Sequence, residues 1–403
     1  MRSVLEKTEV RFSTRREKTF RKLLILGVFY TGSLQIQTKF VRRARVTIAP
    51  EKCVLTCQSS MMALLAPTQS AILHTFAPMH RHARTFRRTP PVFMPEGPEC
   101  QVHAERLNDA FQGYTLLRAT ILSGRYLGEG VPGRGGPPAH WGTFQELLPA
   151  TVKHVKNHGK FIWWEFVHSR SRPHLSFWST LGMSGSWARQ RSAHSRIVFE
   201  LSRPSAVSGA PQEEAALRLF FNDQRMFGTL TVCLDQALLE KKLESLGPSW
   251  LQPNGLSLDE FMKIVDRQRS KKAGRAVPVA KFLMDQSKVA SIGNYLLSES
   301  LYKAQVHPFA VCGDLSNADW AALHEAASRT TVASYASQAA LAAAAGDGAL
   351  SATYGTFAEM EPAFQLLVYR RSEADGLPVR QEEGPHGRSI FWVPEKQTRG
   401  RPA

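Results

Sequence analysis

A proline directly after a methionine begins the part of the chain that is richest in residues suited to catalysis. If Met94 is removed, Pro95 carries a free secondary amine, a nucleophile that can attack an electrophilic carbon and form an iminium. Inside a chain the same nitrogen is an amide whose lone pair is delocalised, and it cannot attack. The sequence therefore predicts that translation starts at Met94, or that processing cuts after it. The alternative is that Pro95 only fixes the entry into a helix.

One acid and a lysine are candidates to assist such an amine. Glu96 follows Pro95 directly and is placed to act as a general acid/base. Its alternative role, and that of Glu99, is to stabilise the N-terminus of a helix; Glu99 has a structural hydrogen bond as a further option. Lys160 lies between Gly159 and an alternating apolar run, which predicts a position at the start of a strand.

Five further strings follow the MPEGPE string of residues 94–99 in a fixed order. They are GKF at 159–161, LGMSG at 181–185, NDQRMFG at 222–228, LMDQ with IGNY at 283–295, and GRSIFW at 387–392. With these strings the chain resembles the formamidopyrimidine-DNA glycosylase/endonuclease VIII family over residues 94–397. The resemblance implies a bifunctional DNA glycosylase and AP lyase of base-excision repair that removes oxidised bases, namely formamidopyrimidines, 8-oxoguanine or hydantoins.

The resemblance gives each catalytic candidate a role. Pro95 would attack the sugar and form the iminium intermediate, and Glu96 would protonate the ring oxygen and then transfer protons during β- or β,δ-elimination. Lys160 would take part in strand cleavage and contact the phosphate at the lesion, although an exposed strand lysine fits the same pattern. No metal cofactor is expected for this chemistry.

Three residues match the family's side chains that fill the space left by an everted base. They are Met183, Arg225 and Phe227. The alternatives are core packing for Met183 and Phe227 and a salt bridge for Arg225, but the Gly/Ser turn around Met183 favours exposure. Many relatives carry a second arginine where this chain has Met226, so one phosphate contact is expected to be missing.

The segment 277–306 resembles the family's helix–two-turn–helix. The turn at 291–293 contains a glycine and can direct backbone N–H groups at a phosphate, and Asn294 is expected to add an amide donor to that phosphate. Residues 346–356 fall where relatives place a loop near the everted base. Their composition does not distinguish one oxidised base from another.

The tail resembles the family's finger but lacks its zinc ligands. The positions of the four family cysteines are taken by Val379, Glu382, Val393 and Lys396. A structural zinc site needs thiolate or imidazole ligands, so we expect a zincless finger in which apolar packing by residues 390–392 replaces the metal. Arg388 would still reach the DNA backbone; the alternative is a surface arginine in a disordered tail.

The hydrophobic pattern predicts the elements that position these residues, in the order β-rich, helical, and then a short hairpin. Strands are expected at 160–166, 174–180, 197–201 and 217–221, with a Gly/Pro-rich loop at 128–138. Helices are expected at 98–111, 236–246, 258–269, 277–286, 293–305 and 318–345, and the hairpin at 366–393. Ser316 and Asp319 form a capping-box-like start for the last helix.

The predicted fold class is therefore α+β. The family's fold implies a β-sandwich with flanking helices, followed by a helix–two-turn–helix domain with a zincless β-hairpin finger. The expected domains are 94–235 (catalytic sandwich), 236–365 (DNA-binding helices) and 366–403 (finger and tail), preceded by the extension 1–93.

The basic charge of the chain is concentrated outside the expected enzyme. The net charge is +17, but residues 1–93 hold 17 Lys and Arg against 4 Asp and Glu, while the other 310 residues hold 34 against 30. Residues 1–93 are expected to be disordered, misannotated or a presequence. The five scattered cysteines indicate no disulfide framework.

The sequence is compatible with three functions to different degrees. The first is the bifunctional enzyme; the second is a catalytically silent protein that binds damaged DNA because the extension blocks Pro95. The third, a structural protein with only the helix–two-turn–helix, explains neither Pro95 nor Lys160. We expect a monomer that binds damaged double-stranded DNA, with no membrane and no zinc. The expected location is the nucleus, or a mitochondrion or plastid if the extension is a presequence.

Overall fold

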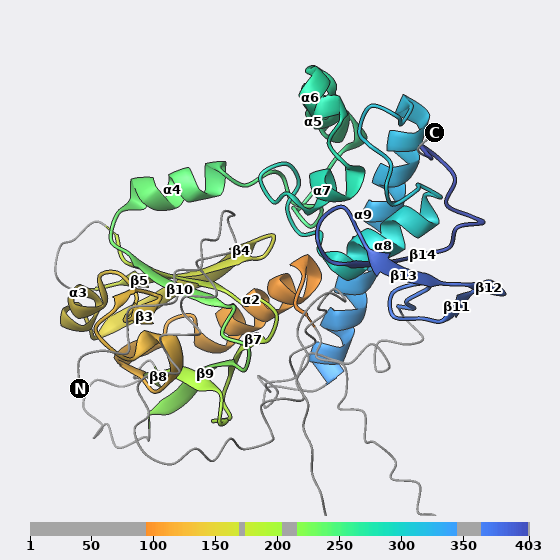
Figure 1. Cartoon of the computed structure of the whole chain (residues 1–403). Coiled ribbons are helices and arrows are strands. Elements are labelled where there is room, and N and C mark those ends of the chain that lie inside the picture. The colour runs from red at the N-terminus through yellow and green to blue at the C-terminus, as the bar shows by residue number, and fades with distance from the viewer. Residues whose placement is uncertain (1–93, 169–173, 204–215, 345–363, 402–403) are drawn as a thin grey trace, which may run out of the picture. The chain divides into compact units, whose positions relative to one another are not determined.

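The computed structural model describes residues 94–168, 174–203, 216–344 and 364–401. The expectations for residues 1–93 and for the loop at 346–356 lie outside these ranges. The described residues fall within one of the two compact units of the chain, the unit that extends from residue 84 to the end. Figure 1 shows its sheet, its helices and a small β-ribbon region.

Helix α2 (Gly97–Phe111) opens the described chain and places the predicted catalytic acids at its start. The Glu99 side chain accepts a hydrogen bond from the backbone N–H of Glu96 at 2.8 Å, which satisfies one of the unpaired donors of the first turn. Leu107 and Phe111 are fully buried against the sheet. The helix thus uses its apolar side to fix its N-terminus, and with it Glu96, relative to the strands.

Eight antiparallel strands form one hydrogen-bonded sheet. They are β1 (Thr115–Ile121), β4 (Ala150–His158), β5 (Phe161–Val167), β6 (Ser176–Thr180), β7 (Gly185–Ala188), β8 (Ser195–Ser202), β9 (Leu217–Asp223) and β10 (Thr229–Cys233). Their order is β10-β6-β5-β4-β1-β8-β9-β7. The four strands predicted from the sequence are present, and β1, β4, β7 and β10 were not predicted.

The sheet folds over on itself, so that its two halves enclose an aromatic core. Phe177 on β6 and Phe199 on β8 have ring centroids 5.2 Å apart. In a flat sheet these strands would lie about 19 Å apart, since β5, β4 and β1 separate them and neighbouring strands are spaced by about 4.8 Å. Trp164 and Trp187 are fully buried in the same core. The arrangement is that of a sandwich built from one continuous sheet.

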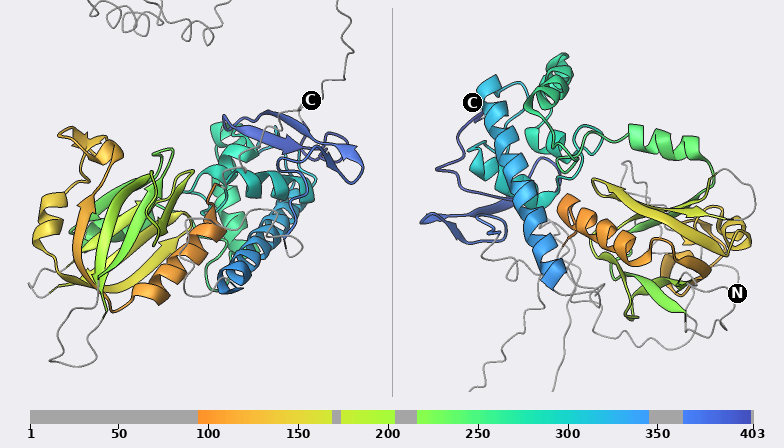
Figure 2. Two further views of the ribbon diagram at one scale, coloured as in Figure 1. Left: turned by 90° about the horizontal axis from the view of Figure 1, so that it is seen from below. Right: turned by 180° about the vertical axis from the view of Figure 1, so that it is seen from behind.

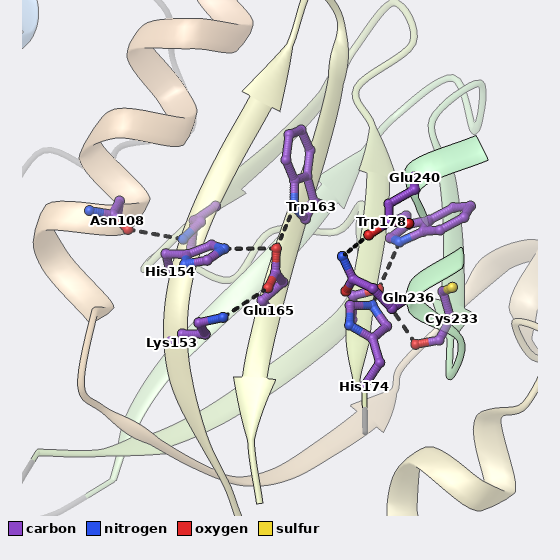
Figure 3. Close-up of polar contacts among 12 residues, drawn as sticks. Asn108, Lys153, His154, Trp163, Glu165, His174, Trp178, Cys233, Gln236 and Glu240 are labelled. Carbon is purple, nitrogen blue, oxygen red and sulfur yellow. Dashed lines mark hydrogen bonds and ion pairs between the residues drawn. The ribbon is translucent and has the colours of Figure 1, made fainter. Parts of the chain in front are cut away.

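Polar side chains on the outside of this sheet connect β4, β5 and α2 (Figure 3). The Glu165 carboxylate accepts a hydrogen bond from the Trp163 indole at 3.1 Å and lies 2.8 Å from His154. Asn108 of α2 accepts a hydrogen bond from the backbone N–H of Val155 on β4. Helix α2 is therefore joined to the sheet by a polar contact as well as by its apolar face.

Short elements connect β1 to β4. They are the 3-10 turn η2 (Gly124–Tyr126), β2 (Val131–Pro132), β3 (Gly135–Gly136) and α3 (Trp141–Glu146). The predicted loop at 128–138 contains the two-residue strands β2 and β3, so it is more ordered than its glycine and proline content indicates.

Six helices follow the sheet: α4 (Gln236–Glu244), α5 (Leu258–Arg269), α6 (Lys272–Arg275), α7 (Val279–Met284), α8 (Asn294–Lys303) and α9 (Asn317–Ala344). The predicted start of α9 is confirmed, because the Ser316 hydroxyl donates to the Asp319 carboxylate at 2.7 Å and accepts from its backbone N–H. Helix α7 is shorter than predicted, since Asp285 already leaves the helical conformation. Helix α9 packs against both α8 and α2 (Figure 2).

The tail forms two small ribbons instead of the single hairpin that the sequence predicted. Strand β11 (Glu373–Ala374) pairs with β12 (Leu377–Pro378), and β13 (Arg380–Glu383) pairs with β14 (Ser389–Trp392). The aspartate and glycine at 375–376 both have positive φ and form the turn between the first pair, which splits the predicted hairpin. The predicted α+β class, a β-sheet domain followed by a helical domain, is confirmed. No helix in the described part of the chain has the length and apolar character needed to cross a membrane.

Candidate active site

A cavity of about 440 Å³ lies between the start of α2, the sheet and the helical domain. Residues from widely separated parts of the sequence line it. Six of the eight residues predicted from the sequence are among them: Pro95, Glu96, Lys160, Met183, Phe227 and Arg388. The fold therefore gathers the predicted amine, acid and lysine in one place, together with two of the predicted base-replacing side chains and the predicted finger arginine.

Glu96 is buried, and its carboxylate closes the N-terminus of α8. The carboxylate oxygens accept hydrogen bonds from the backbone N–H groups of Gly293 at 2.8 Å, Tyr295 at 2.9 Å and Leu296 at 3.3 Å. Burial raises the pKa of Glu96, while the Lys160 charge and these N–H donors act in the opposite direction. A carboxyl group with a raised pKa is suited to give up a proton to a reacting group and to recover it later.

Glycines permit the close approach between Glu96 and the helical domain. A Cβ atom on Gly293 would stand 2.2 Å from Cδ of Glu96, and one on Gly97 would stand 2.2 Å from Cβ of Ser291. The backbone N–H of Gly97 donates to the Ser291 carbonyl at 2.9 Å. Any side chain at these two positions would push Glu96 and the turn before α8 apart.

Glu99 lies behind Glu96 in a buried chain of hydrogen bonds. The Tyr295 hydroxyl donates to Glu99 at 2.9 Å and lies 2.8 Å from the Ser334 hydroxyl on α9. Burial, and then the neighbouring Glu96, raise the pKa of Glu99 to about 7. The two alternatives considered for Glu99, a helix N-terminal contact and a structural hydrogen bond, are both present, because the same carboxyl group also accepts from the backbone N–H of Glu96.

Lys160 occupies the turn between β4 and β5, after Gly159 with its positive φ of 56°. The side chain is half-buried and faces the cavity. Burial lowers the pKa of Lys160, which the negative charge of Glu96 counteracts and the positive charge of Arg388 reinforces. A lysine with a lowered pKa is a better nucleophile and base near neutral pH than an exposed lysine.

Pro95 is buried at the wall of the same cavity. In the chain as it stands, Met94 precedes it and also lines the cavity. The Pro95 nitrogen is then an amide, and the cavity holds a nucleophilic amine at this position only after Met94 has been removed.

The predicted base-replacing residues lie on two adjoining loops. Asp223 fixes both loops, accepting from the Ser184 hydroxyl at 2.6 Å and from the Gly228 backbone N–H at 2.7 Å. The Phe227 ring is 54% exposed, so it is not a core residue. The Arg225 guanidinium lies 5.2 Å from the centre of that ring and is exposed. Phe227 thus carries an apolar ring next to a cation at the edge of the cavity.

Asn294 is not among the residues that line the cavity. Its side-chain NH₂ donates to the Ser389 carbonyl at 2.8 Å, and its oxygen lies 2.8 Å from Nε2 of His386. The residue is buried. The expected contact with a phosphate would therefore require this amide to change partners, whereas Arg388, one residue before Ser389, is exposed and lines the cavity.

The finger positions do not fit a zinc ion. Val393 is fully buried in the helical core, and Val379 packs against that core. Glu382 accepts a hydrogen bond from the Trp392 indole, and the Lys396 ammonium is paired with Asp375. Two of the four positions are aliphatic and a third is a cation, so together they cannot supply the thiolate or imidazole ligands of a structural zinc site. Ile390, Phe391 and Trp392 are buried in the same core.

Sequence reasoning missed several residues of the site, although the motif strings contained most of them. Gln286 lines the cavity and fixes the turn before α8, since its amide donates to the Ile292 carbonyl and accepts from the Ser291 backbone N–H. Tyr295 belongs to the IGNY string, yet its contact with Glu99 was not predicted. Cys100 also lines the cavity and had no motif to mark it.

This fold and cavity define a class of protein in which a β-sheet domain and a helix–two-turn–helix domain share an acid- and amine-lined site. The sequence comparisons agree with that class. The formamidopyrimidine-DNA glycosylase N-terminal domain matches residues 94–230, and the formamidopyrimidine-DNA glycosylase H2TH domain matches residues 252–340. Together the two matched ranges cover more than half of the chain, which belongs to the formamidopyrimidine-DNA glycosylase family, a family of DNA glycosylases of base-excision repair.

Individual relatives of this chain are also formamidopyrimidine-DNA glycosylases. A formamidopyrimidine-DNA glycosylase of Mycoplasma mobile is 30% identical over 39% of this chain and 50% of its own length. One from an Exiguobacterium is 26% identical over 72% of this chain and 91% of its own length. The fold is similar to that of the Lactococcus lactis formamidopyrimidine-DNA glycosylase, solved with DNA that contains an AP site, with a TM-score of 0.55, 18% identity, and coverage of 75% of this chain and 100% of that one.

Proposed function

We propose that this protein is a DNA glycosylase with AP lyase activity that removes oxidised bases through an iminium formed on Pro95. The observation that carries the proposal is the meeting of Pro95, Glu96 and Lys160 at one cavity, although 65 residues separate the proline from the lysine. A protein that only binds DNA needs neither a potential secondary amine nor a buried acid beside it.

Each of these three residues has a defined role in the proposed reaction. The Pro95 amine, freed of Met94, attacks C1′ of the damaged nucleotide; the bond from C1′ to the base breaks, and the sugar ring opens as Glu96 protonates its ring oxygen. The iminium then acidifies the C2′ hydrogen; the Glu96 carboxylate, which gave its proton to the ring oxygen, accepts this one, and the C3′–O bond breaks to expel the 3′ phosphate by β-elimination. Lys160 stabilises the negative charge of the phosphate beside the cavity.

Damaged double-stranded DNA is the proposed partner. Solved structures of the Lactococcus lactis relative are described as complexes with DNA that contains an AP site or an oxidised pyrimidine. We propose that Met183 and Phe227, which line the cavity, occupy the space of an everted base, and that Arg388 contacts the DNA backbone. The proposed substrates are formamidopyrimidines, 8-oxoguanine or hydantoins, and binding should weaken with salt because phosphate contacts contribute much of the affinity.

One observation favours a second candidate function. Met94 is joined to Pro95 in this chain and lines the cavity, so a protein that keeps its first 94 residues has no secondary amine at Pro95. Such a protein would bind damaged DNA without forming a covalent intermediate.

Borohydride trapping on a duplex with an abasic site separates the two candidates. One form begins at Met1 and the other begins at Pro95 after removal of Met94; mass spectrometry of each form establishes its first residue. We expect a covalent adduct with the form that begins at Pro95 only. A peptide map of the adduct, with Lys160→Ala as a control, shows whether the proline or the lysine carries the sugar. If neither form is trapped while both bind damaged duplex, the silent binding protein is supported instead.

A further inference from the structure

We propose that His386 is a positioning residue that, through Asn294, holds the β13–β14 hairpin against α8 and so keeps Arg388 at the cavity. Figure 1 shows the hairpin beside α8, and β14 packs against that helix. The loop between β13 and β14 contains His386 and Arg388, and Ser389 begins β14. The contact between helix and hairpin is therefore made close to the arginine that faces the cavity.

The hydrogen bonds fix the orientation of the Asn294 amide. The Ser389 carbonyl can only accept, so the NH₂ group of Asn294 must face it, at 2.8 Å. The Asn294 oxygen then faces Nε2 of His386, also at 2.8 Å. Because this oxygen can only accept, Nε2 must carry a proton.

The surroundings of His386 favour one neutral tautomer. Its Nδ1 atom is buried and has no hydrogen-bond partner in the described part of the chain. A proton on Nδ1 would bury a charge without a partner, close to Arg388, and both burial and that neighbour lower the pKa of His386. The imidazole is thus held neutral with its proton on Nε2, the form that donates to Asn294.

A second contact with α8 fixes the chain before the finger but does not reach the loop that carries Arg388. Glu299, five residues after Asn294 on the same helix, is buried and accepts hydrogen bonds from the backbone N–H groups of Leu367, Val368 and Tyr369. This fixes the chain before the finger. The turn that carries Arg388 lies about 20 residues further on, and the Asn294 amide attaches it to the helix.

Two properties of the protein depend on His386. Docking of the hairpin is a property of the free protein, whereas the consequence for Arg388 rests on the proposed DNA-binding function. The experiment therefore needs one measurement without DNA and one with it. In both, His386→Leu removes the donor, His386→Gln retains an N–H that can reach the Asn294 oxygen, and Glu383→Ala alters an exposed side chain of the same hairpin.

The first measurement is amide hydrogen exchange of the full chain without DNA. We expect exchange in the hairpin (380–392) to be about tenfold faster in His386→Leu, as for the loss of one hydrogen bond. Exchange should return to near the wild-type rate in His386→Gln and should not change in Glu383→Ala. Peptides of the sheet (150–167) serve as the internal reference for correct folding. Unchanged hairpin exchange in His386→Leu, or equal effects of Leu and Gln, would overturn the proposal.

The second measurement is the affinity for a duplex with a tetrahydrofuran abasic analogue. We expect His386→Leu to weaken binding about five- to tenfold, and to cause no further loss in an Arg388→Ala background, because both changes remove the same contact. Additive losses would show that His386 does not act through Arg388. If the wild-type protein does not prefer the damaged duplex, the proposed function fails, and hydrogen exchange still decides the role of His386.

Discussion

The Glu96 carboxylate and the Gly293 backbone are in direct contact: the Gly293 N–H donates to Glu96 at 2.8 Å, and a Cβ on Gly293 would stand 2.2 Å from the carboxyl carbon. The acid belongs to the start of α2, and the glycine is the residue before α8. The proposed catalytic acid is therefore held in place by the N-terminus of the helix that the sequence identified as part of the DNA-binding motif.

Gly293→Ala should remove activity through this contact. The φ of Gly293 is −128°, which any residue can adopt, so the effect is steric and comes from displacement of Glu96. A shift of about 1 Å in a reacting group costs on the order of 100-fold in rate, and the added methyl group should destabilise the fold by about 1–3 kcal/mol. Single-turnover base excision and urea unfolding measure the two effects.

Gly142→Ala is the matched control. An added Cβ on Gly142 meets no atom within 4 Å, and the residue lies in the short helix α3. We expect unchanged excision and a stability that is equal or higher by up to about 1 kcal/mol. Equal rates for Gly293→Ala and the wild type would show that Glu96 does not depend on this contact.

The raised pKa of Glu99 should make stability depend on pH. Burial raises the pKa of its carboxyl group in the fold to about 7, from an ordinary value of 4.5. Between these values the folded protein keeps a proton that the unfolded chain has lost, so the free energy of unfolding falls as pH rises from 4.5 to 7. The loss amounts to about 3 kcal/mol above pH 7, from about 1.4 kcal/mol for each pH unit.

Glu99→Gln removes this titration and keeps the hydrogen-bonding shape. Relative to the wild type, the variant should gain stability steadily between pH 4.5 and 7 and then remain ahead by a constant amount. Urea unfolding at pH 5, 6, 7 and 8 follows the difference. Parallel curves for the two proteins would mean that Glu99 titrates normally in the fold.

Phe227→Ala should impair excision from duplex DNA without weakening the fold. The ring is 54% exposed, so its loss should change the free energy of unfolding by no more than about 0.5 kcal/mol. Excision from a duplex should slow by about tenfold or more, because the ring no longer replaces the everted base, and single-stranded substrate should be affected less. Leu238→Ala, which truncates a 53% exposed side chain on α4, is the control and should change neither.

Chelators of zinc should leave activity and stability unchanged. The finger is held by buried Val393 and its apolar neighbours and by the Lys396–Asp375 pair, which need no metal. Incubation with 1,10-phenanthroline before an excision assay, with metal analysis of the purified protein, checks this. Inhibition that added zinc reverses, or one zinc per protein molecule, would contradict it.

Much of the fold could be predicted because its elements carry local signals. The predicted bounds 258–269 agree with those of α5, where Ser257 and Glu260 form a capping box. Strand β4 was missed because Lys153, His154 and Lys156 interrupt its apolar pattern. These side chains lie on the polar outside of the sheet, which becomes apparent only once the pairing of β4 with β5 is known.

The candidate site was predictable to the extent that its residues belong to motif strings. The strings identified Glu96 and Lys160, but they could not show what these residues contact. The orientation of Asn294 toward Ser389 depends on the packing of α8 against a hairpin about 90 residues later in the chain. The contact of Glu99 with Tyr295 spans almost 200 residues in the same way, and no local pattern encodes it.

Three of the N–H groups that bond to Glu96 belong to the other domain, and this bears on how such proteins evolve and recombine. A chimera that fused this sheet domain to a foreign helical domain would inherit a carboxyl group with the right sequence around it but a different acidity. Insertions near α4, in the connection between the two domains, would be tolerated only if they left the hydrogen bonds to that carboxyl group in place. Selection on the proposed chemistry would therefore act on both domains at once.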